Sequence, residues 1–181
     1  IAMSRNLANP PSLPGPRPGR EEAVAVVAFG ANLGDREDTI RAAAERIARL
    51  PLVRDVRLSS LFETVALRLD GPDPEAPGYV NAVALVTTRL APSILLGMLH
   101  AIEDEHGRER HERWGDRTLD LDLIAYGDES ADGDGLQLPH PRAFERLFVL
   151  EPWLELDSDA VLPGRGRVAE LVAGLRRRER S

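Results

Sequence analysis

The chain has 181 residues, of which 43% are hydrophobic and 29% charged, and its net charge is −7. This length allows one domain with a sizeable core but not two ordinary domains. With no cysteine, the chain can form neither a disulfide nor a cysteine zinc site. An acidic chain without a long basic face is poorly suited to nonspecific nucleic-acid binding, and no apolar run approaches the roughly 18 to 20 residues that span a bilayer. We therefore expect a cytoplasmic protein that binds neither nucleic acid nor membranes. We also expect a monomer, although nothing in the composition bears on the oligomeric state.

Residues 1–22 are rich in proline and glycine, a composition that supports neither a helix nor a sheet ladder. We expect an extended, mobile arm there, with a linker or a docking segment as the alternatives, and a single domain over residues 23–181.

The first predicted element is a strand over residues 23–29, an unbroken valine-rich run typical of burial on both faces. Residues 30–35 then predict a turn that delivers Asp35 as the N-cap of a helix ending at Pro51. The glycine-rich turn lacks the lysine of a phosphate-binding P-loop, so we interpret it as structural.

Alternation predicts a second strand over residues 56–62, a long loop over 64–78 and a third strand over 79–88. On the third strand Tyr79 and Asn81 share one face. A second helix begins at Pro92 and stops at Gly107.

A fourth strand follows from Thr118, on which Asp120 and Asp122 project to one face while the intervening leucines point to the other. The resulting order β-α-β-β-α-β is the ferredoxin-like arrangement, an α+β fold. Beyond it we expect C-terminal helical and β-hairpin additions: a rigid turn at 138–142, a helix over 143–154 and a terminal helix around 168–175.

Two carboxylates about 6 to 7 Å apart on one strand face suit Mg²⁺, which takes oxygen ligands and shares them with substrate phosphates. The arginines just upstream are complementary, because guanidinium groups bind phosphate oxygens bidentately. These residues together suggest a nucleotide site. The alternative for the aspartates alone is the solvated face of an edge strand.

Four motifs, in this order, resemble the 6-hydroxymethyl-7,8-dihydropterin pyrophosphokinase family: 30–35 (Gly-Ala-Asn-Leu-Gly-Asp), 79–82 (Tyr-Val-Asn-Ala), 113–122 (Arg-Trp-Gly-Asp-Arg-Thr-Leu-Asp-Leu-Asp) and 138–140 (Leu-Pro-His). Enzymes of this family move a diphosphate from ATP to a pterin alcohol in folate biosynthesis. The resemblance spans about residues 24 to 155.

The resemblance implies a role for each matching residue. Asp120 and Asp122 would hold two Mg²⁺ ions that bridge the ATP phosphates. The ATP-binding residues would be Glu103, near the adenine, with Arg108, Arg117, His140 and Arg146. A mobile catalytic loop would contain Arg110, Arg113 and Trp114. The pterin would lie between Tyr79 and Phe148, with Asn81 at its edge and the backbone around Thr64 and Leu67 completing the pocket.

Other interpretations of these residues exist. Tyr79 and Phe148 could be core aromatics, and His140 a turn residue. The whole chain could be a non-catalytic ferredoxin-like module that binds nucleotide for regulation, because this fold hosts many functions. The presence of both aspartates together with Arg117, His140 and the two aromatics favours the enzyme.

Overall fold

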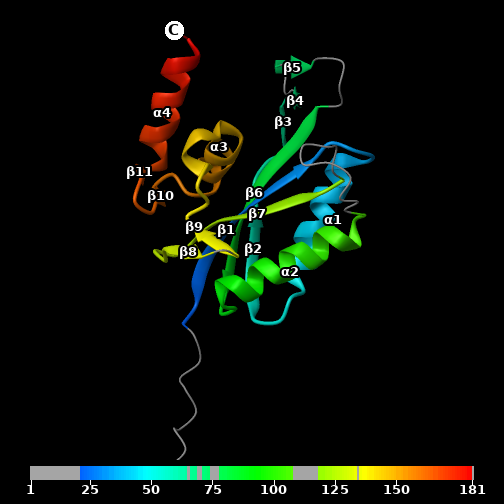
Figure 1. Cartoon of the computed structure of the whole chain (residues 1–181). Helices are drawn as coiled ribbons and strands as arrows, with labels where there is room; N and C mark the ends of the chain where they lie inside the picture. The colour runs from blue at the N-terminus through cyan, green and yellow to red at the C-terminus, as the bar shows by residue number, and fades with distance from the viewer. Residues whose placement is uncertain are drawn as a thin grey trace, which may run out of the picture.

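The computed structural model describes residues 21–64, 66–68, 71–73, 78–107, 118–133 and 135–180, and the side chains of 66–68 and 71–73 are not described (Figure 1). The predicted arm therefore lies outside the described residues, apart from its last two. Within the described part of the chain, no helix is long and apolar enough to cross a membrane.

A central antiparallel sheet has the strand order β2-β6-β1-β7, and β3 pairs with the far end of β6. Its strands are β1 (Ala23–Ala31), β2 (Val53–Leu58), β3 (Phe62–Thr64), β6 (Tyr79–Thr88) and β7 (Asp120–Tyr126). With α1 (Arg36–Ala48) between β1 and β2, and α2 (Pro92–Glu105) between β6 and β7, the ferredoxin-like arrangement is confirmed.

The additions lie outside this core. They are the hairpins β4–β5 (Ala66–Arg68 and Gly71–Asp73), β8–β9 (Ala131–Gly133 and Leu136–Leu138) and β10–β11 (Val161–Leu162 and Gly166–Arg167), the 3₁₀ turn η1 (Ala143–Glu145), and the helices α3 (Leu147–Leu156) and α4 (Val168–Glu179).

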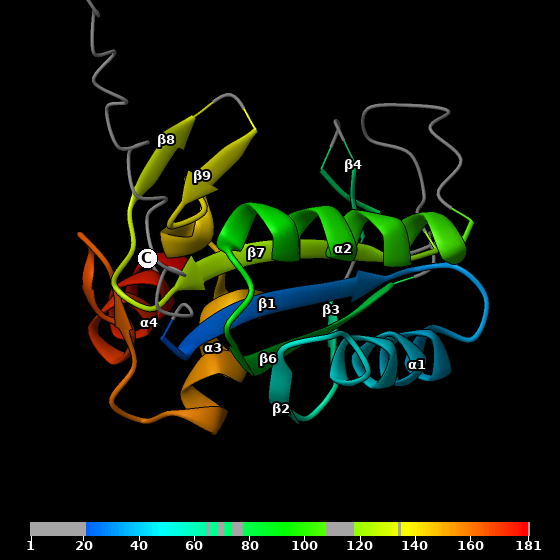
Figure 2. The same cartoon turned by 90° about the horizontal axis from the view of Figure 1, so that it is seen from below.

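Two hydrophobic clusters sandwich the sheet, because successive side chains of a strand alternate between its faces. One cluster joins Phe29, Val80 and Leu121 to the helices α1 and α2. The other joins Ala28 and Val83 to α3 and α4, which lie on the opposite face (Figures 1 and 2). β1, in the middle, is buried on both faces over most of its length, as its valine-rich run predicts.

The N-cap prediction for α1 is confirmed, since the side chain of Asp35 accepts a hydrogen bond from the backbone N–H of Asp38. The helix ends at Ala48, just before Pro51. The second helix ends at Glu105, and Gly107 follows it with a φ of +82°, a conformation that favours glycine at a helix end.

Three boundary predictions were wrong. The strand predicted over 56–62 is two strands, because the hydroxyl of Ser59 accepts a hydrogen bond from the backbone N–H of Val83 and interrupts the ladder. The predicted loop 64–78 contains the β4–β5 hairpin. The helix predicted over 143–154 breaks at Arg146, whose backbone is extended.

Gly30 and Ala31 are a fourth correction. The sequence places them in a turn, but they continue β1 and pair with β6, and Gly30 also pairs with β7. The strand extends because both neighbouring strands reach this far, which the local glycine-rich pattern does not reveal.

Candidate active site

One row of directly paired residues crosses the sheet at the end that begins β7. Asp120 of β7 lies opposite Gly30 of β1, and Gly30 lies opposite Asn81 of β6. Directly paired residues of antiparallel strands share a face. This face is opposite to the one that α1 and α2 cover, because Phe29, Val80 and Leu121 point toward those helices.

Gly30 leaves space between its two polar neighbours. A Cβ atom added there would lie 3.7 Å from Asn81 Oδ1, 4.0 Å from Asp120 Cβ and 4.0 Å from Tyr79 Cδ1. The side chains of Asn81, Asp120 and Tyr79 therefore converge around a patch of bare backbone, as is typical of a glycine where a ligand approaches a strand closely. We name Gly30, Tyr79, Asn81 and Asp120 the sheet-end patch.

Hydrogen bonding orients Asn81 within this patch. The side chain is 5% exposed, and its Nδ2 donates to Thr64 Oγ1 at 2.8 Å. Thr64 in turn pairs with Tyr79 across β3 and β6. Three of the residues predicted to bind the pterin, Thr64, Tyr79 and Asn81, therefore lie together. For Leu67 the structure places the backbone in β4, and the side chain is not described.

Asp122 lies two residues along β7 on the same face as Asp120, as predicted, and both are half-buried. Its Oδ2 accepts from Arg146 Nη1 at 3.2 Å. Arg146 reaches it from the break between η1 and α3, where its backbone is extended. Phe148, two residues further, is 38% exposed, and the Arg146 guanidinium carbon lies 5.7 Å from the centre of its ring.

His140 follows the β8–β9 hairpin and is fixed to β7, because its backbone N–H donates to the carbonyl of Ile124 at 2.8 Å. Its Nδ1 accepts from the N–H of Arg142 at 3.2 Å, so the neutral ring carries its proton on Nε2. Burial lowers the pKa of His140 below its ordinary 6.5; Arg146 and Arg142 act in the same direction, and the two aspartates oppose them. At neutral pH the ring is therefore an uncharged donor.

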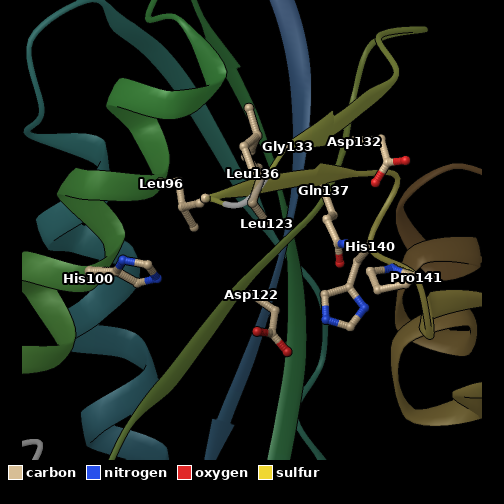
Figure 3. A pocket seen from close by; sticks show the side chains of 11 residues that line it. Leu96, His100, Asp122, Leu123, Asp132, Gly133, Leu136, Gln137, His140 and Pro141 are labelled. Carbon is tan, nitrogen blue, oxygen red and sulfur yellow. The ribbon is translucent and has the colours of Figure 1, made fainter.

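A cavity of about 490 Å³ adjoins Asp122 and His140 (Figure 3). Leu96 and His100 of α2 form one wall, Leu123 of β7 another, and the β8–β9 hairpin the third. Figure 3 shows the side chains of Asp122 and His140 directed into the same space. The volume is typical of small-molecule sites, and the mixture of leucine and polar side chains suits a flat ring with polar edges.

Glu103 does not line this cavity. It is 2% exposed, and its Oε1 accepts from the backbone N–H of Leu121 at 2.7 Å. Leu121 stands between the two aspartates on β7, which is an edge strand of the sheet among the described residues, so the carboxylate satisfies an outward-facing backbone donor there. The predicted contact of Glu103 with adenine stays a prediction.

The remaining predicted site residues, Arg108, Arg110, Arg113, Trp114 and Arg117, lie outside the described residues. Sequence reasoning missed Gly30, His100, Leu123 and Gln137. Gly30 had a usable signal, a glycine at the end of a strand pattern. His100, Leu123 and Gln137 had none, since they come together only through the packing of α2, β7 and a hairpin.

Comparison with known proteins identifies the family to which the chain is similar. Residues 26–158 match the family model of 7,8-dihydro-6-hydroxymethylpterin-pyrophosphokinase. A 2-amino-4-hydroxy-6-hydroxymethyldihydropteridine pyrophosphokinase from Haemophilus influenzae is 42% identical over 82% of this chain and 90% of its own. The protein of that name from Pseudomonas aeruginosa is 43% identical over 81% and 88%.

Solved structures agree on the fold. A Plasmodium falciparum HPPK-DHPS crystallised with pterin and p-hydroxybenzoate superposes with a TM-score of 0.65 at 13% identity, over 91% of this chain. The chain spans only 43% of that longer protein.

Proposed function

Since the chain belongs to the 7,8-dihydro-6-hydroxymethylpterin-pyrophosphokinase family, we propose that it transfers diphosphate from ATP to 6-hydroxymethyl-7,8-dihydropterin in folate biosynthesis. The products are the pterin diphosphate and AMP. The position of the aspartate pair supports this proposal most directly. Asp122 lines the cavity beside α2, and Asp120 belongs to the sheet-end patch, so the two carboxylates lie between a space for ATP and a surface for the pterin.

ATP binds in the cavity, with its base among Leu96, Leu123 and Leu136 and its phosphates toward Asp122. The Nε2–H of His140 and the guanidinium of Arg146 are donors at the phosphate end, and Arg108 and Arg117 add to them. A neutral donor and a cation so placed bind phosphate oxygens without a proton transfer.

Mg²⁺ fits the aspartate pair. The two half-buried carboxylates offer hard oxygen ligands, and among the described residues no group of three or more His, Asp or Glu side chains gathers as a metal site. A site with two protein carboxylates leaves the remaining positions to water and ATP phosphates, which is how Mg²⁺ is usually held beside nucleotides. The two ions of our proposal would neutralise the charge that develops on the transferred phosphate oxygens.

The pterin lies on the sheet-end patch. Asn81 has its Nδ2 turned to Thr64, so its carbonyl oxygen is oriented to accept from the edge of the ring. Tyr79 and Phe148 offer aromatic faces to the flat heterocycle. The backbone at Thr64 and Leu67 closes this pocket.

In the reaction, the hydroxymethyl oxygen of the pterin attacks the β-phosphorus of ATP. The bond between that phosphorus and the α,β-bridging oxygen breaks, and AMP leaves with the electron pair. The residues of this chain act mainly by in-line positioning and charge stabilisation, because phosphoryl transfer needs little covalent chemistry from the protein. As the family resemblance implies, Arg110, Arg113 and Trp114 would contact the reactants, and in our proposal Asp122 accepts the hydroxyl proton. Near-normal turnover by Asp122→Asn would exclude this last role.

The decisive experiment incubates the protein with Mg-ATP and 6-hydroxymethyl-7,8-dihydropterin and separates the products. AMP and the pterin diphosphate should form in equal amounts. ADP as the nucleotide product would refute the proposal. ATP binding without turnover would favour a regulatory nucleotide-binding module instead. The proposal includes a monomeric enzyme, and gel filtration of the active protein tests this.

A further inference from the structure

Arg36 is the first residue of α1, a position where a cation is unfavourable because helix N-termini carry partial positive charge. Its side chain nevertheless has partners outside the helix. It is 29% exposed and reaches the strands beside the sheet-end patch. Its Nη1 donates to the carbonyl of Gly78, and its Nη2 lies 3.1 Å from Glu63 Oε1.

These two partners immediately precede two residues of the proposed pterin pocket. Glu63 comes before Thr64 in β3, and Gly78 comes before Tyr79 in β6. One planar guanidinium therefore joins the end of β3 to the start of β6.

The two strands are packed closely at this point. A Cβ atom added at Gly78 would lie 2.9 Å from the carbonyl oxygen of Thr64, closer than side-chain atoms normally approach a backbone oxygen. β3 has three residues and, within the described part of the chain, pairs only with β6, so its own ladder is short. A strand of this length depends on contacts outside the sheet to stay in place.

The two contacts of Arg36 differ in strength. Glu63 is 72% exposed, so this ion pair is screened by solvent and contributes little. The bond to the Gly78 carbonyl is part-buried and joins a charged donor to a backbone acceptor, which makes it the stronger of the two.

We propose that Arg36 is a positioning residue for the pterin: it holds the ends of β3 and β6 together and so fixes Thr64 and Tyr79, and through Thr64 the amide of Asn81. This inference rests on the proposed pterin site and adds a residue that holds the site in position. Among the described residues, the hydrogen bonds and the ion pair of Arg36 reach neither the aspartate pair nor the residues that line the cavity. Replacing Arg36 should therefore affect the binding of the pterin and not that of ATP.

The test compares Arg36→Met, which keeps an unbranched apolar stem but loses both donors, with the wild type. We expect the KM for the pterin to rise on the order of tenfold, the loss expected for a charge-assisted hydrogen bond that acts indirectly. The KM for ATP should change less than twofold. Arg36→Lys should recover part of the pterin affinity, because an ammonium group can still donate to the Gly78 carbonyl.

Arg41→Met is the matched control. Arg41 lies on the same helix and forms a 3.4 Å ion pair with Glu37, both side chains being more than half exposed. This variant should behave as the wild type in both KM values.

The outcomes separate the two proposals. A wild-type chain that makes no pterin diphosphate would refute the proposed function and this inference together. A wild type that turns over, with equal pterin KM values for Arg36→Met and Arg41→Met, would refute the role of Arg36 alone. A parallel rise of both KM values in Arg36→Met would show a general structural role and would also overturn it.

Discussion

Replacing Gly30 by alanine should separate the stability of the fold from the binding of the pterin. Gly30 lies between Asn81 and Asp120, and the added methyl group would meet its nearest neighbours at 3.7 to 4.0 Å. These are ordinary van der Waals distances, and Gly30 is not among the glycines with positive φ. The substitution should leave stability unchanged or raise it by about 0.4 to 1 kcal/mol, because alanine restricts the unfolded chain more than glycine does.

The same methyl group should impair the binding and reaction of the pterin. It extends about 1.5 Å from the backbone, the length of a carbon–carbon bond, into the space above the sheet-end patch. A ring resting on Gly30 must rise by about that distance. A displacement of about 1 Å from the reactive geometry can reduce the rate about 10²-fold. We therefore expect kcat/KM for the pterin to fall about 100-fold in Gly30→Ala, with ATP affinity retained.

The assay is steady-state AMP formation with the pterin varied at saturating Mg-ATP, beside a thermal melt of each protein. Gly97→Ala is the control, because Gly97 is exposed on α2 with nothing within 4 Å of an added Cβ. It should raise the melting temperature by about 2 to 4 °C without changing turnover. A Gly30→Ala enzyme whose pterin kcat/KM stays within twofold of the wild type would refute the position of the pterin over Gly30. A loss of turnover together with a lower melting temperature would instead make Gly30 a structural residue.

Four further changes test the site. Asp120→Ala should abolish AMP formation while the melting temperature is kept, because the side chain is only half-buried at the end of the sheet; a large drop in melting temperature would make it structural. Glu103→Ala should lower the free energy of unfolding by about 1 to 3 kcal/mol, measured in urea, since the Leu121 N–H loses its buried acceptor, and Glu103→Gln should recover most of this. Arg146→Met should raise the KM for ATP more than that for the pterin; the reverse order would contradict its phosphate role. Below pH 6.5 the unfolded chain binds a proton that folded His140 resists, so acidification should destabilise the wild type more than His140→Gln in urea titrations; equal losses would contradict the lowered pKa.

Local patterns in the sequence were sufficient for the faces of the strands, the start of α1 and the end of α2. Asp120 and Asp122 share a face because side chains alternate along a strand, and this holds whatever the strand pairs with. Asp35 caps α1 because its carboxylate needs only the N–H three residues on. The element order alone indicated the ferredoxin-like sheet, since short connections and antiparallel pairing leave few alternatives.

The contents of the site depended on tertiary structure. Gly30 belongs to the proposed pterin surface only because β6 and β7 both extend beside it, a long-range pairing that a glycine-rich segment does not specify. His100 reaches the cavity through the packing of α2 against β7. Arg146 reaches Asp122 because the predicted helix breaks there. Sequence alone thus indicated which charged residues could carry the proposed chemistry, and the fold decided which residues stand beside them, because such surfaces form only when distant segments meet.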